Sequence, residues 1–205
     1  MKKLRLTLMV AMLAVITVAS AQMNLGIKGG LNMSNYVVGD EVTDKNMKIG
    51  FHVGLAADYN FAPNMAVQSG LFFTTKGSTL KYGENIEFTE NLMYLQLPVH
   101  LAYKVDVTPG TRIVFHGGPY VAYGIGGKRT AKAGNLTGDW DVGKMFGDAA
   151  GQYKPFDAGL GLGVGAEFGP ILVDLGWDMG LVNISNMSKG NVKNQNAYLS
   201  VGYKF

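Results

Sequence analysis

Residues 156–168 alternate strictly between apolar side chains and small or charged ones. The segment reads FDAGLGLGVGAEF, with Phe, Ala, Leu or Val at the even-numbered positions and Asp, Gly or Glu at the odd-numbered ones. A period of two residues is typical of a β-strand, because successive side chains of a strand point to opposite faces. The pattern therefore predicts a strand with one apolar face.

The same alternation recurs in seven other segments. In the tail NAYLSVGYKF it continues to the last residue, Phe205. After residue 21 no sustained helical stripe of apolar residues is present. The chain is therefore expected to be all-β, with strands at residues 24–34, 48–60, 65–76, 93–105, 112–123, 156–168, 171–181 and 195–205.

The connections between these segments alternate between short and long. The short ones are residues 61–64, 106–111 and 169–170, and the long ones are residues 35–47, 77–92, 124–155 and 182–194. Outer-membrane barrels sort their connections in this way, with short periplasmic turns and long extracellular loops. A membrane strand needs ~9–11 residues, and only a closed sheet pairs its whole backbone in lipid. We therefore predict an eight-stranded antiparallel up-and-down transmembrane β-barrel.

The start of the chain has the pattern of a signal peptide. Three basic residues, Lys2, Lys3 and Arg5, precede an apolar run over residues 6–18. Residues 19–21 then form a small-residue cleavage site. The alternative is a membrane anchor, but the apolar run is short for a span of ~20 residues. We expect residues 1–21 to be a signal peptide and residues 22–205 to form a barrel domain in a Gram-negative outer membrane.

Charge and cysteine content narrow the possible functions. The chain has 18 basic and 15 acidic residues, and three of the basic ones lie in the expected signal peptide. The remaining charges balance, so electrostatic binding of nucleic acid is not expected. The chain has no cysteine, which excludes disulfides, thiolate metal ligands and a cysteine nucleophile.

Aromatic residues gather near the predicted strand ends. Threading the strands up and down a barrel places them at its two ends, as expected for girdles at the membrane interfaces. The periplasmic group is Tyr59, Phe61, Tyr103, Phe168 and Phe205, and the outer group is Phe51, Phe73, Tyr123 and Phe156. The main alternative fold is a soluble β-sandwich or lipocalin-like barrel, which would turn its apolar phase inward.

The other phase of the strands carries charges and many glycines, as expected for the narrow lumen of an eight-stranded barrel. The predicted lumenal charge network comprises Lys28, Asp58, Lys104, Arg112, Asp157, Glu167, Asp174 and Asp178, and Lys76 shares its phase. Buried charges need partners, so these residues are expected to pair and to plug the lumen. A small ion pathway is the alternative.

No motif predicts a catalytic residue, a cofactor or a metal site. The glycines of residues 159–165 share one strand face and precede no helix, unlike those of a phosphate-binding loop. His52, His100 and His116 fall in the lumenal phase of three strands, where hydrogen bonding is expected rather than metal binding. A serine–histidine–acid set assembled across strands is the enzymatic alternative.

The third long connection carries two further features. Lys128, Arg129 and Lys132 are candidates for contact with lipopolysaccharide phosphates, with a solvated loop as the alternative. The same connection contains large apolar residues, which are unusual in a solvated loop. These residues, Trp140, Met145 and Phe146, are expected to fold the loop onto itself or to mark a partner surface.

Five segments carry a family resemblance: MAVQSGLFFTTKGSTL, MYLQLPVHLAYKVDV, GGPYVAYGIGG, DAGLGLGVGAEFGPILVDLGWDMGLVNIS and NAYLSVGYKF. In this order they resemble the PorT-like small outer-membrane β-barrel proteins, often labelled porin-family proteins. The most specific element is Tyr94-Leu95-x-Leu97-Pro98, followed by Lys76-Gly77. The resemblance implies an eight-stranded outer-membrane barrel. It implies little biochemistry, although one branch of the family is associated with a protein-secretion apparatus.

These observations predict a monomeric barrel with a structural or surface-interaction role and no enzymatic activity. The alternatives are a narrow porin-like channel and an accessory component of a protein-secretion apparatus. Expected partners are outer-membrane lipid, lipopolysaccharide and the barrel-insertion machinery. The last of these is expected to recognise the alternating C-terminal strand that ends at Phe205.

Overall fold

The computed structural model describes residues 23–38, 41–42, 47–82, 86–133, 136–140, 145–148, 151–186 and 190–205. The expected signal peptide at residues 1–21 lies outside the described residues. The described chain forms ten strands. They are β1 (Met23–Val38), β2 (Glu41–Val42), β3 (Lys48–Ala62), β4 (Met65–Tyr82), β5 (Ile86–Thr108), β6 (Thr111–Ala133), β7 (Leu136–Trp140), β8 (Phe156–Phe168), β9 (Ile171–Gly180) and β10 (Val192–Lys204).

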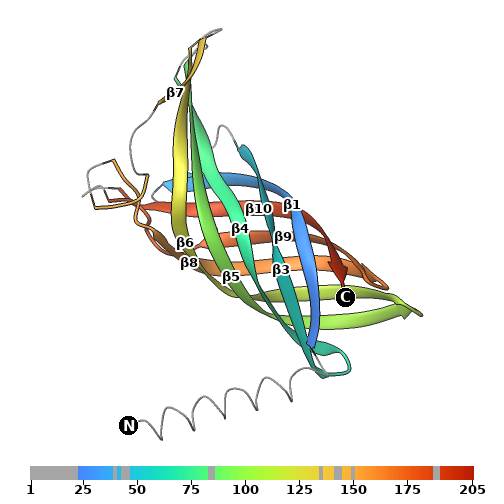
Figure 1. Ribbon diagram of the computed structural model, residues 1–205. Helices are drawn as coiled ribbons and strands as arrows, with labels where there is room; N and C mark the ends of the chain where they lie inside the picture. Colours follow the sequence, from blue (N-terminus) through green and yellow to red (C-terminus); the bar gives the residue numbers. More distant parts are fainter. Residues whose placement is uncertain are drawn as a thin grey trace, which may run out of the picture.

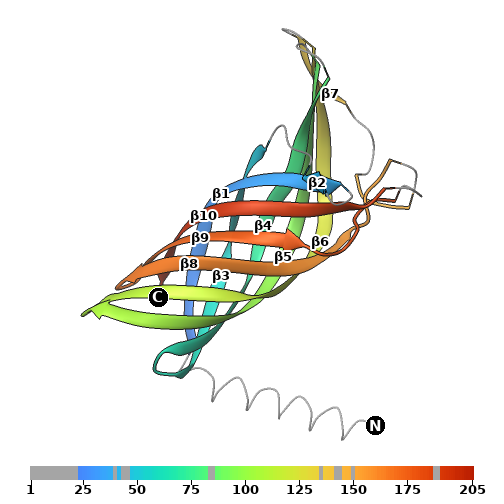
Figure 2. The same ribbon diagram turned by 180° about the vertical axis from the view of Figure 1, so that it is seen from behind.

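Eight of these strands form a closed antiparallel barrel (Figures 1 and 2). Their order around the barrel is β1, β3, β4, β5, β6, β8, β9 and β10, which is also their order along the chain. The sheet closes because β10 pairs with β1, from Gly26 opposite Lys204 to Val38 opposite Val192. The predicted up-and-down barrel is therefore confirmed, and closure leaves the barrel wall without a free edge.

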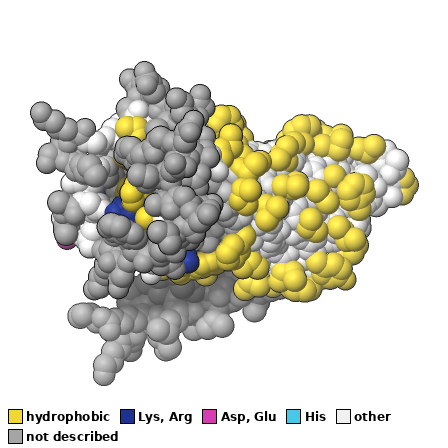
Figure 3. All heavy atoms as spheres, turned by 90° about the horizontal axis from the view of Figure 1, so that it is seen from above, with side chains coloured by type: hydrophobic (Ala, Val, Ile, Leu, Met, Phe, Trp, Pro, Cys, Tyr) yellow, Lys and Arg dark blue, Asp and Glu magenta, His cyan; other side chains and the backbone are white. Residues whose placement is uncertain are grey.

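The apolar phase of the strands faces outward. In β9 the exposed side chains are Ile171, Val173, Leu175, Trp177 and Met179, and every residue between them is buried. Hydrophobic side chains cover the visible barrel wall (Figure 3). This arrangement is the reverse of a soluble barrel, whose apolar side chains fill the interior.

In the described part of the chain, no helix has both the length and the hydropathy needed to cross a membrane.

Four strands form a sheet that projects beyond one end of the barrel (Figure 1). β4 and β5 stay paired out to Tyr82 opposite Ile86, and β6 pairs both with β5 and with β7. The prediction of loops at residues 77–92 and over all of residues 124–155 was therefore wrong. Outside the hydrocarbon layer a paired strand needs no apolar face, so these extensions lack the alternation that marks the barrel strands.

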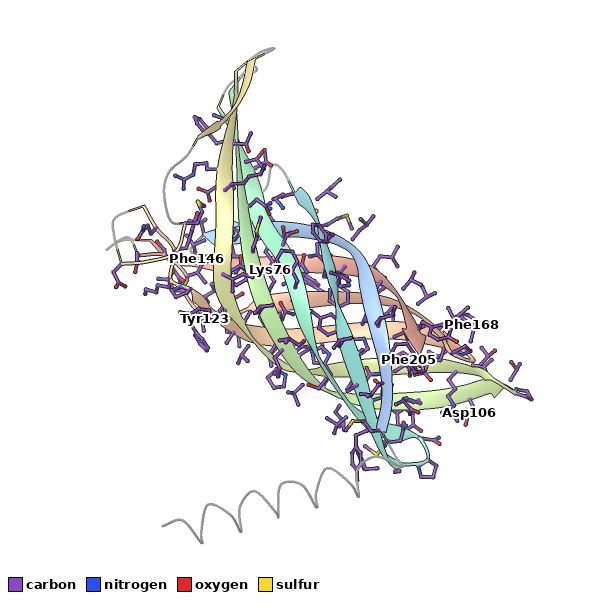
Figure 4. All side chains as sticks on the ribbon, in the orientation of Figure 1. Lys76, Asp106, Tyr123, Phe146, Phe168 and Phe205 are labelled. Atoms are coloured by element: carbon purple, nitrogen blue, oxygen red, sulfur yellow. The ribbon has the colours of Figure 1, made fainter. Side chains whose placement is uncertain are left out.

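The predicted aromatic residues lie mainly on the outer surface of the barrel. All except Phe73 are exposed, and Phe73 is half-buried with its ring 5.7 Å from that of Phe51. Tyr123 lies toward one end of the barrel and Phe168 and Phe205 toward the other (Figure 4). Phe115, opposite Tyr103 in the sheet, is an exposed aromatic residue that the sequence analysis left out of both groups.

Candidate functional site

The lumen is the candidate site, because the polar side chains converge there. Glycines on the lumenal face make room for large neighbours. A Cβ atom at Gly163 would collide with the His116 imidazole, and one at Gly176 would collide with the Tyr198 ring. The glycines on the lumenal face of β8 and β9 thus leave space for large side chains in the lumen.

A layer of four charges lies at the end of the lumen that carries the short turns. Lys104 Nζ lies 3.1 Å from Asp58 Oδ2 and 3.2 Å from Glu167 Oε1. Lys204 Nζ lies 2.6 Å from each of the same two oxygens. Two cations and two carboxylates therefore balance in one buried cluster, as buried charges require.

The middle of the lumen holds a chain of hydrogen-bonded groups. Asp174 forms an ion pair with Lys28 and accepts a hydrogen bond from His116 Nε2, 2.8 Å from its Oδ1. The Nδ1 atoms of His116 and His100 are 3.0 Å apart, and their rings stack with centroids 5.1 Å apart. The chain links β1, β9, β6 and β5 across the barrel.

A serine, a histidine and an asparagine form a second chain at mid-lumen. His52 Nε2 lies 2.9 Å from Ser200 Oγ, and His52 Nδ1 lies 2.8 Å from Asn32 Oδ1. The order matches that of a hydrolytic triad, but the Ser200 side chain is fully buried. Asn32 also donates to the backbone oxygens of Phe51 and Thr75. The set is therefore built as a structural link between β1, β3, β4 and β10.

A third layer lies toward the end of the barrel that carries the long connections. The ion pair of Lys76 Nζ with Asp157 Oδ2, at 3.4 Å, is wholly buried. Lys76 Nζ also lies 4.4 Å from the centre of the Tyr120 ring, within the range of a cation–π contact. Asp157 accepts a further hydrogen bond of 2.9 Å from Asn194 Nδ2.

An apolar cap covers this end of the lumen. Met145 and Ile184, from two different connections, are buried with Tyr94 and Tyr120 of the barrel wall. The ring of Phe146 packs edge-on against that of Tyr94, with centroids 5.3 Å apart. Met145 and Phe146 were expected to fold the loop onto itself or to mark a partner surface, whereas the structure shows this part of the connection packed against the barrel wall. The side chain of Trp140 lies outside the described residues.

Backbone hydrogen bonds join the two connections of the cap to each other and to strand β6. Gly124 N donates to Pro155 O and Lys154 N donates to Ile184 O. Beside the cap, Tyr153 Oη donates to the carboxylate of Glu90, which also pairs with Arg129. Burial, and then the nearby Glu90 carboxylate, raise the pKa of Tyr153.

A cavity of about 80 Å³ remains among these groups in the middle of the lumen. Since one water molecule needs ~10–15 Å³ by the same measure, several would fit. Its lining includes the polar side chains of Gln96, His100 and Asp178 and the apolar side chains of Phe72 and Leu172.

The structure brings together seven of the eight residues predicted to form the lumenal charge network. Arg112 is the exception, because its Nε donates to Asp106, 2.6 Å away, in an ion pair that is largely exposed beside a short turn. Lys204 and Lys76 take part in the buried pairs and were absent from the predicted network. The alternation in the tail had placed Lys204 in the lumenal phase, which was the signal for including it.

The three histidines lie in the lumen as the sequence indicated, on β3, β5 and β6. In the described part of the chain, no three histidine, aspartate or glutamate side chains converge in a way that could hold a metal ion.

Several solved structures of small outer-membrane barrels are similar to this chain. Ail, the attachment invasion locus protein of Yersinia pestis, is 14% identical with a TM-score of 0.42, covering 90% of this chain and 99% of its own. Neisserial surface protein A is 11% identical with a TM-score of 0.46, covering 88% and 97%. OprG from Pseudomonas aeruginosa is 13% identical with a TM-score of 0.48, covering 89% and 95%.

Comparison with curated proteins gives no match. Residues 19–186 match the family described as "Outer membrane protein beta-barrel domain". Because this match spans most of the chain, the protein belongs to that family, whose members reside in the bacterial outer membrane.

Proposed function

We propose that the protein is a closed, monomeric membrane anchor that presents the sheet of β4–β7 at the cell surface. The observation that carries the proposal is the filling of the lumen at three levels. Charged layers occupy the two ends of the membrane region, hydrogen-bonded histidines occupy its middle, and an apolar cap covers the outer mouth. Eight strands leave an interior that side chains can fill, which supports a structural lumen over a pore.

Planar-bilayer recording tests the closed lumen. The folded wild-type barrel is expected to produce no discrete conductance steps, because a lumen filled by ion pairs and covered by the cap would hold no continuous water path. A variant carrying Lys76→Ala, Lys104→Ala and Phe146→Ala, which shortens a side chain in each charged layer and in the cap, is the positive control. Regular single-channel steps from the wild-type protein would support the narrow-channel alternative and contradict the proposal of a closed lumen.

The projecting sheet is the part of the molecule that we propose meets other molecules. It extends from the end opposite the short turns, which is the extracellular end in barrels of this kind. Capture from native membranes compares the wild type with a variant in which a short turn replaces residues 79–89. A partner that binds both proteins equally would contradict a role for the sheet.

Membership of the PorT-like family is proposed on the sequence resemblance, and recognition by the insertion machinery on the alternating C-terminal strand that ends at Phe205. Service in a secretion apparatus stays an alternative, because no residue of the resembling segments assigns the chain to that branch. The exposed apolar wall supports contact with outer-membrane lipid. Lipopolysaccharide binding at the projecting sheet is proposed on the basic residues Lys128, Arg129 and Lys132 of the sequence, of which the side chain of Lys132 lies outside the described residues.

We also propose that the protein has no hydrolytic activity. The burial of Ser200, and the hydrogen bonds that tie Asn32 to two strands, support a structural role for the serine–histidine–asparagine set. Incubation with labelled lipopolysaccharide and phospholipid is expected to release no product. Turnover by the wild type that Ser200→Ala abolishes without unfolding the barrel would overturn this part of the proposal.

A further inference from the structure

Asp178 differs from the other buried carboxylates of the lumen. Asp58, Asp157, Glu167 and Asp174 each have a basic side chain within 4 Å. Among the described residues, the hydrogen-bond partner of Asp178 is Gln96, whose Nε2 lies 2.9 Å from Asp178 Oδ2, and no basic group forms an ion pair with it. Lys28 and Lys76 act on Asp178 from beyond ion-pair distance. A buried carboxylate without a paired cation is costly, so this position suits a further positive charge.

The histidine pair leaves an acceptor beside Asp178. His116 Nε2 donates to Asp174, so the other nitrogen of a neutral His116 accepts the hydrogen bond from His100 Nδ1. His100 Nε2 is then a lone-pair acceptor, and it is buried without a hydrogen-bond partner. Hydrogen bonding thus assigns the tautomers, and the unpaired nitrogen is an acceptor.

Two amide oxygens complete a set of acceptors. Gln96 Oε1 and Asn196 Oδ1 are buried without partners, and both side chains are more than nine-tenths buried. The Gln96 orientation follows from Asp178, because its NH₂ group must face the carboxylate. Asn196 lies opposite Asp178 in the pairing of β10 with β9. All four side chains line the lumenal cavity.

Gly161 shows that two of these acceptors are close together. A Cβ built on Gly161 would lie 2.7 Å from His100 Nε2 and 2.8 Å from Asp178 Oδ1. The two atoms are therefore at most about 5.5 Å apart, a separation that one hydrogen-bond donor can bridge. Gly161 also faces Asp178 in the register of β8 and β9.

We propose that the lumenal cavity binds a small primary ammonium ion. Its three N–H groups donate to Asp178, His100 Nε2 and Gln96 Oε1, and Asn196 supplies a further acceptor. Its single charge matches the single unpaired carboxylate. The apolar side chains of Phe72, Val114 and Leu172 on the cavity wall suit a short alkyl group. A directly coordinated divalent metal fits less well, because only His100 and Asp178 of these four acceptor residues are titratable and Gln96 turns its NH₂ toward Asp178. Among the described residues, no three histidine, aspartate or glutamate side chains are placed to hold a metal ion.

This site is independent of whether the barrel conducts or binds a partner at its surface. It is tested with full-length protein refolded in lipid nanodiscs and equilibrated with methylammonium. NMR of the imidazole groups is expected to show saturable shifts at His100, and methanol, the neutral molecule of similar shape, is expected to give none. No saturable shift with methylammonium in a folded barrel would overturn the proposal, and so would saturable shifts with zinc or magnesium alone.

Single substitutions distinguish loss of binding at this site from general effects on the structure of the lumen. Asp178→Asn keeps the shape and removes the charge, and it is expected to weaken methylammonium binding at least about tenfold, the loss typical of a charge-assisted hydrogen bond. Asp106→Asn removes a carboxylate at the exposed turn and is expected to bind like the wild type. Should Asp178→Asn fail to fold, His100→Gln provides the second test, with a comparable loss expected. Unchanged binding in a folded Asp178→Asn or His100→Gln variant contradicts the proposal.

Discussion

At the scale of single residues, charged side chains in the lumen form ion pairs with more than one partner of opposite charge. Asp58 on β3 accepts hydrogen bonds from Lys104 on β5 and from Lys204 on β10. These two strands lie on either side of β3 around the barrel. Removing Asp58 leaves two buried ammonium groups with Glu167 as their remaining carboxylate partner. The stability of this layer therefore depends on Asp58 far more than on any exposed ion pair.

We expect Asp58→Ala to lower the free energy of unfolding by about 3–5 kcal/mol, the cost typical of breaking a buried ion pair. Urea unfolding of the barrel in lipid vesicles measures this difference. Asp106→Ala, which breaks an exposed pair with Arg112, is the matched control and should change the free energy by about 0–1 kcal/mol. An Asp58→Ala variant as stable as the control would contradict the account of this layer.

Lumenal glycines give a second prediction at this scale. A methyl group at Gly163 would overlap the His116 imidazole, whereas one at Gly126 would meet no atom within 4 Å. Gly163→Ala should therefore destabilise the barrel by about 1–3 kcal/mol, the usual cost of overpacking. Gly126→Ala should have little effect in the same urea titration. Equal stabilities of the two variants would show that the lumen is not packed around Gly163.

At the scale of strands, alternation predicted every barrel strand because lipid and lumen impose opposite demands on adjacent residues. It could not predict the projecting parts of β4, β5 and β6, where no lipid selects one face. The phase of the alternation also shows which face of the sheet a residue lies on, but not how far along the barrel axis it lies. Arg112 shares the phase of the lumenal charges, yet it lies next to a short turn and pairs with Asp106 instead.

The projecting hairpin is expected to be separable from the barrel. Replacing residues 79–89 with a short turn removes pairing that lies beyond the layer of Lys76 and Asp157. The free energy of unfolding should change by less than about 1 kcal/mol, as expected for shortening a surface hairpin. Loss of the heat-modifiable folded band on gels from this variant would mean that the projecting sheet supports the barrel itself.

The last strand is expected to be essential for assembly. Phe205 N donates to Leu25 O over 2.8 Å, Tyr203 lies opposite Ile27, and Lys204 holds two buried carboxylates. Deleting Tyr203–Phe205 removes all three links and should prevent stable membrane assembly. Lys204→Gln keeps the strand and is expected to assemble with reduced stability. A truncated protein that still migrates as a folded, membrane-inserted barrel would refute the prediction.

At the scale of the whole molecule, the proposed lumenal sites depend on the residues that barrel closure brings into contact. The ammonium-binding cavity and the apolar cap combine residues from strands far apart in the sequence. Their contacts depend on the register around the full barrel, which periodicity within one strand does not contain. Sequence therefore predicted most of the residues that enter the lumen, with Arg112 as an exception, and only the closed structure shows which of them meet.

Closure itself is the central claim, and a disulfide test addresses it directly. Leu31 on β1 lies opposite Leu199 on β10, both on the outer face, and the chain has no cysteine of its own. Opposed residues of an antiparallel pair have Cα atoms about 4.5–5.5 Å apart, within the reach of a disulfide. Leu175 pairs with Leu199 from the other side, so it lies one strand farther from Leu31.

We expect the Leu31→Cys/Leu199→Cys protein to form an intramolecular disulfide in lipid vesicles, detected as a shift in gel mobility that reductant reverses. The Leu31→Cys/Leu175→Cys protein should form none under the same conditions. Cross-linking of the second pair with none of the first would contradict a barrel closed by β1 and β10.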